Sequence, residues 1–70
     1  MNFENLQIKE DFIKLDSALK FSSLVPTGGI AKMVILDGLV LVNGEFCTMR
    51  GKKLRRGAKV EFDGKGFVIV

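Results

Sequence analysis

The apolar pattern of this sequence changes at Asp37-Gly38, and this change constrains the fold more than any other feature of the chain. Before it, apolar residues within 31–35 recur at i, i+3 and i+4, the spacing of one face of a helix. After it, residues 39–42 form a short β-rich apolar run, and Asn43-Gly44 is the strongest short-range signal for a hairpin. The sequence therefore predicts helices followed by an antiparallel sheet, the order of an α+β domain.

Two helices are expected ahead of this change, after a short strand. Residues 5–9 alternate polar and apolar side chains, which is typical of a half-buried strand. Residues 15–19 show helical spacing, and Pro26 ends that helix or follows it closely. The second helix begins after Thr27, a hydroxyl residue suited to an N-cap, and stops at Gly38, which can adopt the left-handed conformation. The very short connection requires the two helices to pack closely.

The second half of the chain is expected to complete the sheet. Residues 45–50 return from the hairpin as a strand, residues 59–62 alternate again, and residues 66–70 form the closing strand after a turn at Asp63-Gly64. The stretch 50–59 is expected to be a loop. The predicted fold class is α+β, with two packed helices against a small antiparallel sheet.

A chain of 70 residues forms one small domain, expected to cover residues 1–70. Cys47 is the single cysteine and histidine is absent, which excludes an internal disulfide, an ordinary zinc site, and Ser-His-Asp or Cys-His catalysis. We therefore expect a binding module rather than an enzyme, with no cofactor and no metal. The apolar runs are too short to span a bilayer, and the first residues lack the features of a signal peptide, so a cytoplasmic protein is expected.

The net charge of +3 is concentrated in one stretch. Residues 1–35 carry four basic and four acidic side chains, whereas residues 36–70 carry seven basic and four acidic. Residues 50–59, called here the basic segment, hold six basic residues and no acidic one. Such clustering attracts polyanions, and arginine suits bidentate contact with phosphate. The alternative is a solvated loop that keeps an apolar protein soluble. Because Arg55 and Arg56 are expected to lie in this loop, replacing either should cost no more than ~0.5 kcal/mol of stability.

Thr27-Gly28-Gly29 places small residues and unobstructed amides at the start of a helix, a natural site for an anion. The spacing of the glycines and Lys32 differs from that of a P-loop. The alternative is a glycine pair that permits a tight turn between two helices. The six phenylalanines and Cys47 lie in apolar patterns, so we expect them in the core and expect no platform for base stacking.

Taken together, these motifs resemble the S4-type RNA-binding domain, and in particular the small stand-alone bacterial proteins made of this domain alone. The resemblance covers about residues 8–62. The motifs that carry it are Leu15-Asp16 in the first helix, Ala31-Lys32 in the second, Val42-Asn43-Gly44 at the hairpin and Arg50-Gly51-Lys52-Lys53-Leu54 in the basic segment. The resemblance implies the αL RNA-binding motif as the fold and a role associated with translation.

The resemblance also implies contacts with RNA at the start of the second helix, on the helix pair and along the basic segment. The residues so implied are Lys20, Thr27, Gly28, Gly29, Lys32, Arg50, Lys52, Lys53, Arg55 and Arg56. Three positions depart from the family pattern. Gly28 stands where many members have arginine, which weakens the phosphate contact at the helix end. Ile30 and Ala58 stand where glutamate and aspartate are frequent, which bears on stability and surface rather than on binding.

The resulting hypothesis is an RNA-binding module that recognises a folded RNA, ribosomal or transfer RNA, by shape and phosphate contacts. The alternative is a protein–protein adaptor that docks an acidic partner through the basic segment, and DNA binding is a third candidate. Ile30 and Met33 are apolar but lie outside the core stripe of the second helix. We expect them to be partly exposed and to meet a protein partner or a second copy of this chain.

Overall fold

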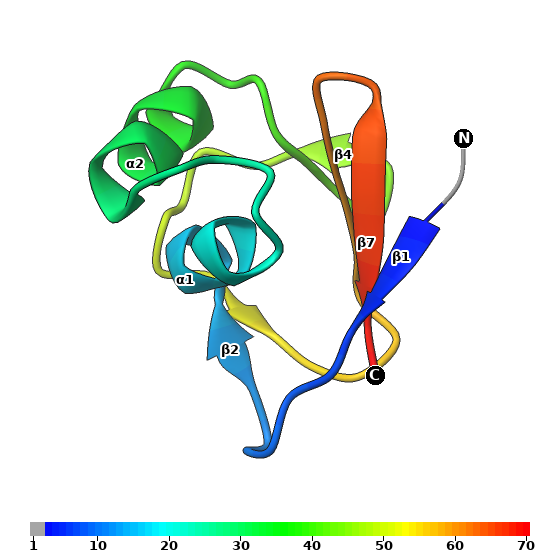
Figure 1. Ribbon diagram of the computed structural model, residues 1–70. Helices are drawn as coiled ribbons and strands as arrows, with labels where there is room; N and C mark the ends of the chain where they lie inside the picture. Colours follow the sequence, from blue (N-terminus) through cyan, green and yellow to red (C-terminus); the bar gives the residue numbers. More distant parts are fainter. Residues whose placement is uncertain (1–2) are drawn as a thin grey trace.

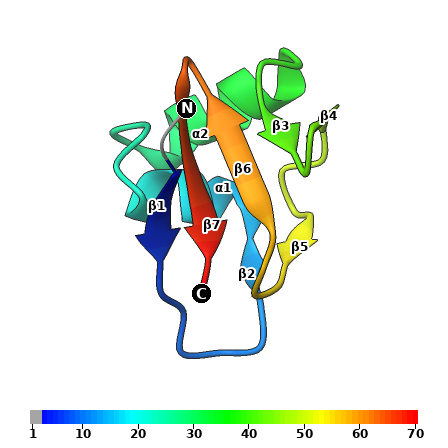
Figure 2. The ribbon, with the colours of Figure 1, turned by 90° about the vertical axis from the view of Figure 1, so that its right-hand side faces the viewer.

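Two helices lie against one face of a five-stranded sheet, with a two-stranded ribbon beside them (Figure 1). This computed structural model describes residues 3–70. The elements are β1 (Phe3–Leu6), β2 (Ile13–Lys14), α1 (Leu15–Phe21), α2 (Gly28–Leu36), β3 (Leu41–Val42), β4 (Glu45–Phe46), β5 (Lys53–Leu54), β6 (Lys59–Phe62) and β7 (Lys65–Ile69). The sheet order is β1-β7-β6-β3-β4, and β2 pairs with β5 in the ribbon. Seen with the sheet toward the viewer, both helices lie behind it (Figure 2). The predicted α+β class is confirmed.

The helix α2 begins and ends where the sequence predicts. Its cap is Thr27, whose Oγ1 accepts a hydrogen bond from the Ile30 amide at 3.2 Å. At the other end, the amides of Gly38 and Leu39 donate back to carbonyls of the last turn at 3.0 and 3.1 Å, the two bonds of a Schellman motif. This motif requires the left-handed φ of +73° that Gly38 adopts. Neither helix in the described part of the chain is long and apolar enough to cross a membrane.

The central pairings of the sheet are antiparallel, as predicted, and the hairpin between β3 and β4 turns at Asn43-Gly44. The first strand differs: it lies at residues 3–6 rather than 5–9 and adds to β7 in parallel, with Phe3 opposite Gly66. Glycine is needed there because a Cβ at Gly66 would lie 2.6 Å from the Phe3 ring. The strand β4 ends at Phe46, before the expected residue 50, and the chain then crosses to the start of α1. The sheet is therefore mixed, with one parallel edge.

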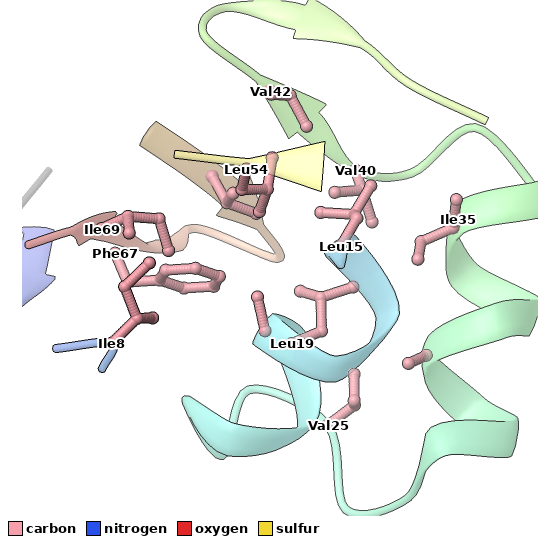
Figure 3. Packing of buried hydrophobic residues seen from close by; sticks show 13 residues of the cluster. Ile8, Leu15, Leu19, Val25, Ile35, Val40, Val42, Leu54, Phe67 and Ile69 are labelled. Atoms are coloured by element: carbon pink, nitrogen blue, oxygen red, sulfur yellow. The ribbon is translucent and has the colours of Figure 1, made fainter. Parts of the chain in front are cut away.

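The core lies between the helices and the sheet (Figure 3). The residues at its centre are Leu15 and Leu19 of α1, Ile35 of α2, and Phe67 and Ile69 of β7, each at most 1% exposed. The other buried members are Ile8, Ala18, Val25, Ala31, Val40, Val42, Leu54 and Val60. The stripe predicted for α2 is largely confirmed, since two of its residues are buried and the third packs against this cluster.

The phenylalanines do not all enter this core. Phe67 does, but Phe21 is 65% exposed and Phe46 is 71% exposed. The prediction that the phenylalanines are core residues is wrong for these two. Phe12 is half-buried, and Cys47 is half-buried at the edge of the core. Aromatic rings are therefore present at the surface, which the apolar pattern of the sequence does not indicate.

Candidate nucleic-acid interface

The backbone of the basic segment is fixed to the start of α1. No side chain caps this helix; instead, the Leu15 amide donates to the Lys52 carbonyl at 2.9 Å and the Asp16 amide donates to the Arg50 carbonyl at 3.1 Å. A helix leaves its first four amides without intrahelical partners, and these are two of them. The segment therefore stabilises α1 while α1 holds the segment in place. The side chains of Arg50 and Lys52 are exposed.

Part of the basic segment is a strand, where the sequence predicts a loop. The strand β5 pairs antiparallel with β2, with Leu54 opposite Ile13 and Lys53 opposite Lys14. Leu54 is buried in the core, so one apolar residue fixes the middle of the segment to the fold. Because side chains alternate along a strand, the two lysines lie on the outer face of the ribbon. Residues 52–58 also line a shallow hollow of about 440 Å³ next to β3.

Four cations of the basic segment contact other parts of the protein, and one of them is Lys59, whose Nζ lies 5.5 Å from the centre of the Phe3 ring. The Lys53 Nζ lies 4.9 Å and the Arg55 Cζ 5.9 Å from the centre of the Phe12 ring, within reach of a cation–π interaction. Arg56 donates a hydrogen bond through Nη2 to the Ile8 carbonyl at 3.0 Å. These contacts restrict the side chains before any ligand binds, which reduces the conformational entropy lost on binding.

The start of α2 is built differently. A Cβ added at Gly28 would meet no atom within 4 Å, and one added at Gly29 would meet only the Thr27 Oγ1 at 3.8 Å. Neither glycine has a positive φ. The packing therefore gives no support to the alternative in which these glycines permit a tight turn between helices. Neither glycine has a side chain that could cover its own amide at this helix start, and Lys32 is exposed in the same helix.

The predicted contact residues form two groups at opposite ends of α1. The basic segment meets the start of the helix, whereas Lys20 lies in its last turn and residues 27–32 follow the connection to α2. In Figure 2 this connection lies on the left and β5 on the right. The helix has seven residues and is therefore about 10 Å long. Nine of the ten predicted residues are exposed, and Gly28 is half-buried.

Phe12 and Lys14 are not among the contact residues predicted from the sequence, although both lie next to cations of the basic segment. Lys14 stands opposite Lys53 in the ribbon, and the Phe12 ring contacts two of the segment's cations. A strand of two residues leaves no periodic pattern to recognise. The sequence signal for them is weak: Phe12 and Lys14 are two positions apart, the spacing of side chains on one face of a strand, directly before the helix.

The outer side of α2 is apolar. Ile30 is 39% exposed and Met33 is 63% exposed, which confirms the partial exposure predicted for both. Leu36 is also exposed on this helix.

Among residues 3–70, no three side chains of His, Cys, Asp or Glu gather where they could hold a metal ion.

Comparison with known proteins agrees with this geometry. The sequence model of the S4 domain matches residues 6–70 of the chain. A protein of Bacillus subtilis (strain 168), described as a probable ribosome maturation protein RlbA, is 38% identical over 61 residues, which cover 87% of this chain and 86% of the relative. The match spans both helices, the hairpin and the basic segment. The chain therefore belongs to the S4 domain family.

Proposed function

We propose that this chain binds folded ribosomal RNA during maturation of the ribosome, with the basic segment as its main contact. The observation that carries the proposal is the display of Arg50, Lys52, Lys53 and Arg55 on a backbone that α1 and β2 hold in place. Membership in the S4 domain family and similarity to a probable ribosome maturation protein support ribosomal RNA over other polyanions. In this proposal the chain is a cytoplasmic binding module and supplies no catalytic group or cofactor.

Binding in this proposal is mainly electrostatic. Lysine and arginine side chains neutralise RNA phosphates and release the counterions that surround them. Amides at the start of α2 hold a further phosphate and fix the orientation of the RNA without reading its sequence. Because the two groups lie at opposite ends of α1, a helix about 10 Å long, they suit phosphates that are spaced apart on a folded RNA. Shape and phosphate position are then recognised before base identity.

Crosslinking the protein to RNA in growing cells, followed by sequencing of the attached RNA, tests which RNA is bound. We expect ribosomal RNA to be enriched over all other RNA. Enrichment of transfer RNA would contradict the ribosomal assignment and favour the second class of folded RNA. Recovery of an acidic protein without RNA would overturn the proposal in favour of an adaptor that docks through the basic segment.

The salt dependence of binding to purified ribosomal RNA tests whether the basic segment makes the contact. Contacts with three to five phosphates predict a log–log slope of about −2 to −4.5, at ~0.7 to 0.9 per phosphate. Replacing Arg50 and Lys52 together by glutamine should reduce the magnitude of this slope by about 1.8. Lys59→Gln is the control, because Lys59 belongs to the same run of charges but its Nζ lies 5.5 Å from the centre of the Phe3 ring, at the sheet. Equal slopes in all three proteins would contradict the assignment.

A further inference from the structure

A hollow lined by two aromatic rings lies beside the basic segment and shares Phe12 and Lys14 with its surroundings. Phe12 and Phe21 line it together with Ile8 and Ile13, and its volume is about 520 Å³. Sites for small molecules measure about 300–1,000 Å³. Phe12 is half-buried and Phe21 is largely exposed, so solvent reaches both rings. We call this site the Phe12–Phe21 hollow.

Cations dominate the surroundings of the Phe12–Phe21 hollow. Among the described residues that line the hollow, Lys9 and Lys14 are cations and Glu10 is the one carboxylate. Two cations of the basic segment approach the Phe12 ring at 4.9 and 5.9 Å. The apolar interior is thus combined with a basic rim, which favours an occupant that carries both a flat apolar group and negative charge.

The hollow is continuous with the basic segment. Lys14 lies opposite Lys53 in the ribbon, and the carbonyl of Ile8 accepts the hydrogen bond from Arg56 at 3.0 Å. Away from the basic segment, the hollow extends along α1, where Ser17 and Phe21, the last residue of the helix, line it. A chain bound along the basic segment can therefore enter the hollow without leaving the protein surface.

We propose that the Phe12–Phe21 hollow holds the base of an unpaired nucleotide of the bound RNA, stacked on these two rings. Lys14 and Lys53 contact the phosphates that flank this nucleotide. Aromatic side chains stack with any base, since every base has a π face, and neighbouring cations hold the backbone that carries it. The inference rests on the proposed function and names one feature of the RNA, a bulge or loop nucleotide with its base turned out.

The test compares two RNA hairpins that differ by one base. One carries a single bulged adenosine, and the other carries an abasic residue at the same position, so both have the same charge. We expect the wild-type protein to bind the adenosine hairpin about tenfold more tightly. Phe21→Leu should abolish this preference, because it removes an exposed ring and leaves the core intact. Phe46→Leu is the matched control, since it removes an equally exposed ring outside the hollow and should keep the preference.

Phe12→Leu should act as Phe21→Leu does, with thermal melting to check that the ribbon remains folded. Equal binding of both hairpins by the wild type, with steep salt dependence, would overturn the base site and leave the proposed function standing. Binding of neither hairpin and of no ribosomal RNA would overturn both. If Phe21→Leu keeps the preference for adenosine but loses a protein from pull-downs, the hollow belongs to a protein partner and the proposal is wrong.

Discussion

The basic segment and the start of α2 are the two groups of predicted RNA contacts, and the fold holds them in different ways. The basic segment caps α1 with its carbonyls, inserts Leu54 into the core, and donates a hydrogen bond from Arg56 to a carbonyl 48 residues earlier in the chain. The start of α2 is shaped by local interactions. Thr27, directly before the helix, caps it by accepting a hydrogen bond from the Ile30 amide three residues later, and a Cβ on either glycine would meet no atom closer than 3.8 Å.

This difference separates two kinds of experiment. In the basic segment, one substitution changes both the stability of the fold and the affinity for RNA, so the two quantities must be measured side by side. At the start of α2, a substitution changes the surface and leaves the packing as it is. A variant there therefore reports on the RNA contact directly. In the basic segment, by contrast, neighbouring cations contact different parts of the fold, so each variant there needs its own measurement of stability.

The largest effect is expected where the basic segment enters the core. Leu54→Ala removes a side chain that is 1% exposed, and it should lower the free energy of unfolding by about 2–5 kcal/mol. Leu36→Ala is the control, since Leu36 is 63% exposed on α2 and its loss should cost less than ~0.5 kcal/mol. Urea denaturation measures both. Similar costs for the two variants would show that the basic segment is not fixed through the core.

The second prediction separates two adjacent arginines. Arg56→Ala removes the hydrogen bond to the Ile8 carbonyl and should cost about 1–2 kcal/mol, because a charged donor serves a partly buried acceptor. Arg55→Ala removes only a cation–π contact at 5.9 Å and should cost no more than ~0.5 kcal/mol. The sequence alone predicts that both arginines lie in a loop and that replacing either has the same small cost in stability. Equal stability of the two variants, measured by thermal melting, would support that expectation against the structure.

The features predicted well from the sequence are those set by neighbouring residues. The Thr27 cap, the left-handed Gly38 and the Asn43-Gly44 hairpin each depend on a few consecutive positions. The features missed depend on partners far away in the chain. The strand β1 pairs with β7, and β5 pairs with β2, although no local sequence pattern indicates either pairing. For the same reason the charge pattern located the basic segment but could not show which of its cations contact Phe12 or Ile8.

The third prediction concerns the start of α2. Gly28→Asp should lower the affinity for ribosomal RNA about fivefold, because a carboxylate repels the phosphate held at the helix end. The free energy of unfolding should stay the same or rise by up to ~1 kcal/mol, since a negative charge suits a helix start and glycine is a poor helix former. Gly28→Ala is the control and should keep the affinity. Unchanged affinity in Gly28→Asp would show that this end of the helix does not touch RNA.

The smallest effect on stability is expected on the outer side of α2. Ile30→Glu with Met33→Lys replaces side chains that are 39% and 63% exposed, so the free energy of unfolding should change by no more than ~0.5 kcal/mol for each. Association is expected to respond instead, because exposed apolar side chains gathered on one helix face favour contact with another molecule. Sedimentation and pull-downs compare the variant with the wild type, and the variant should lose the associated protein or second copy. A wild type that sediments as a monomer and retains no partner protein would contradict this prediction, while the RNA contacts at the other two surfaces would be unaffected.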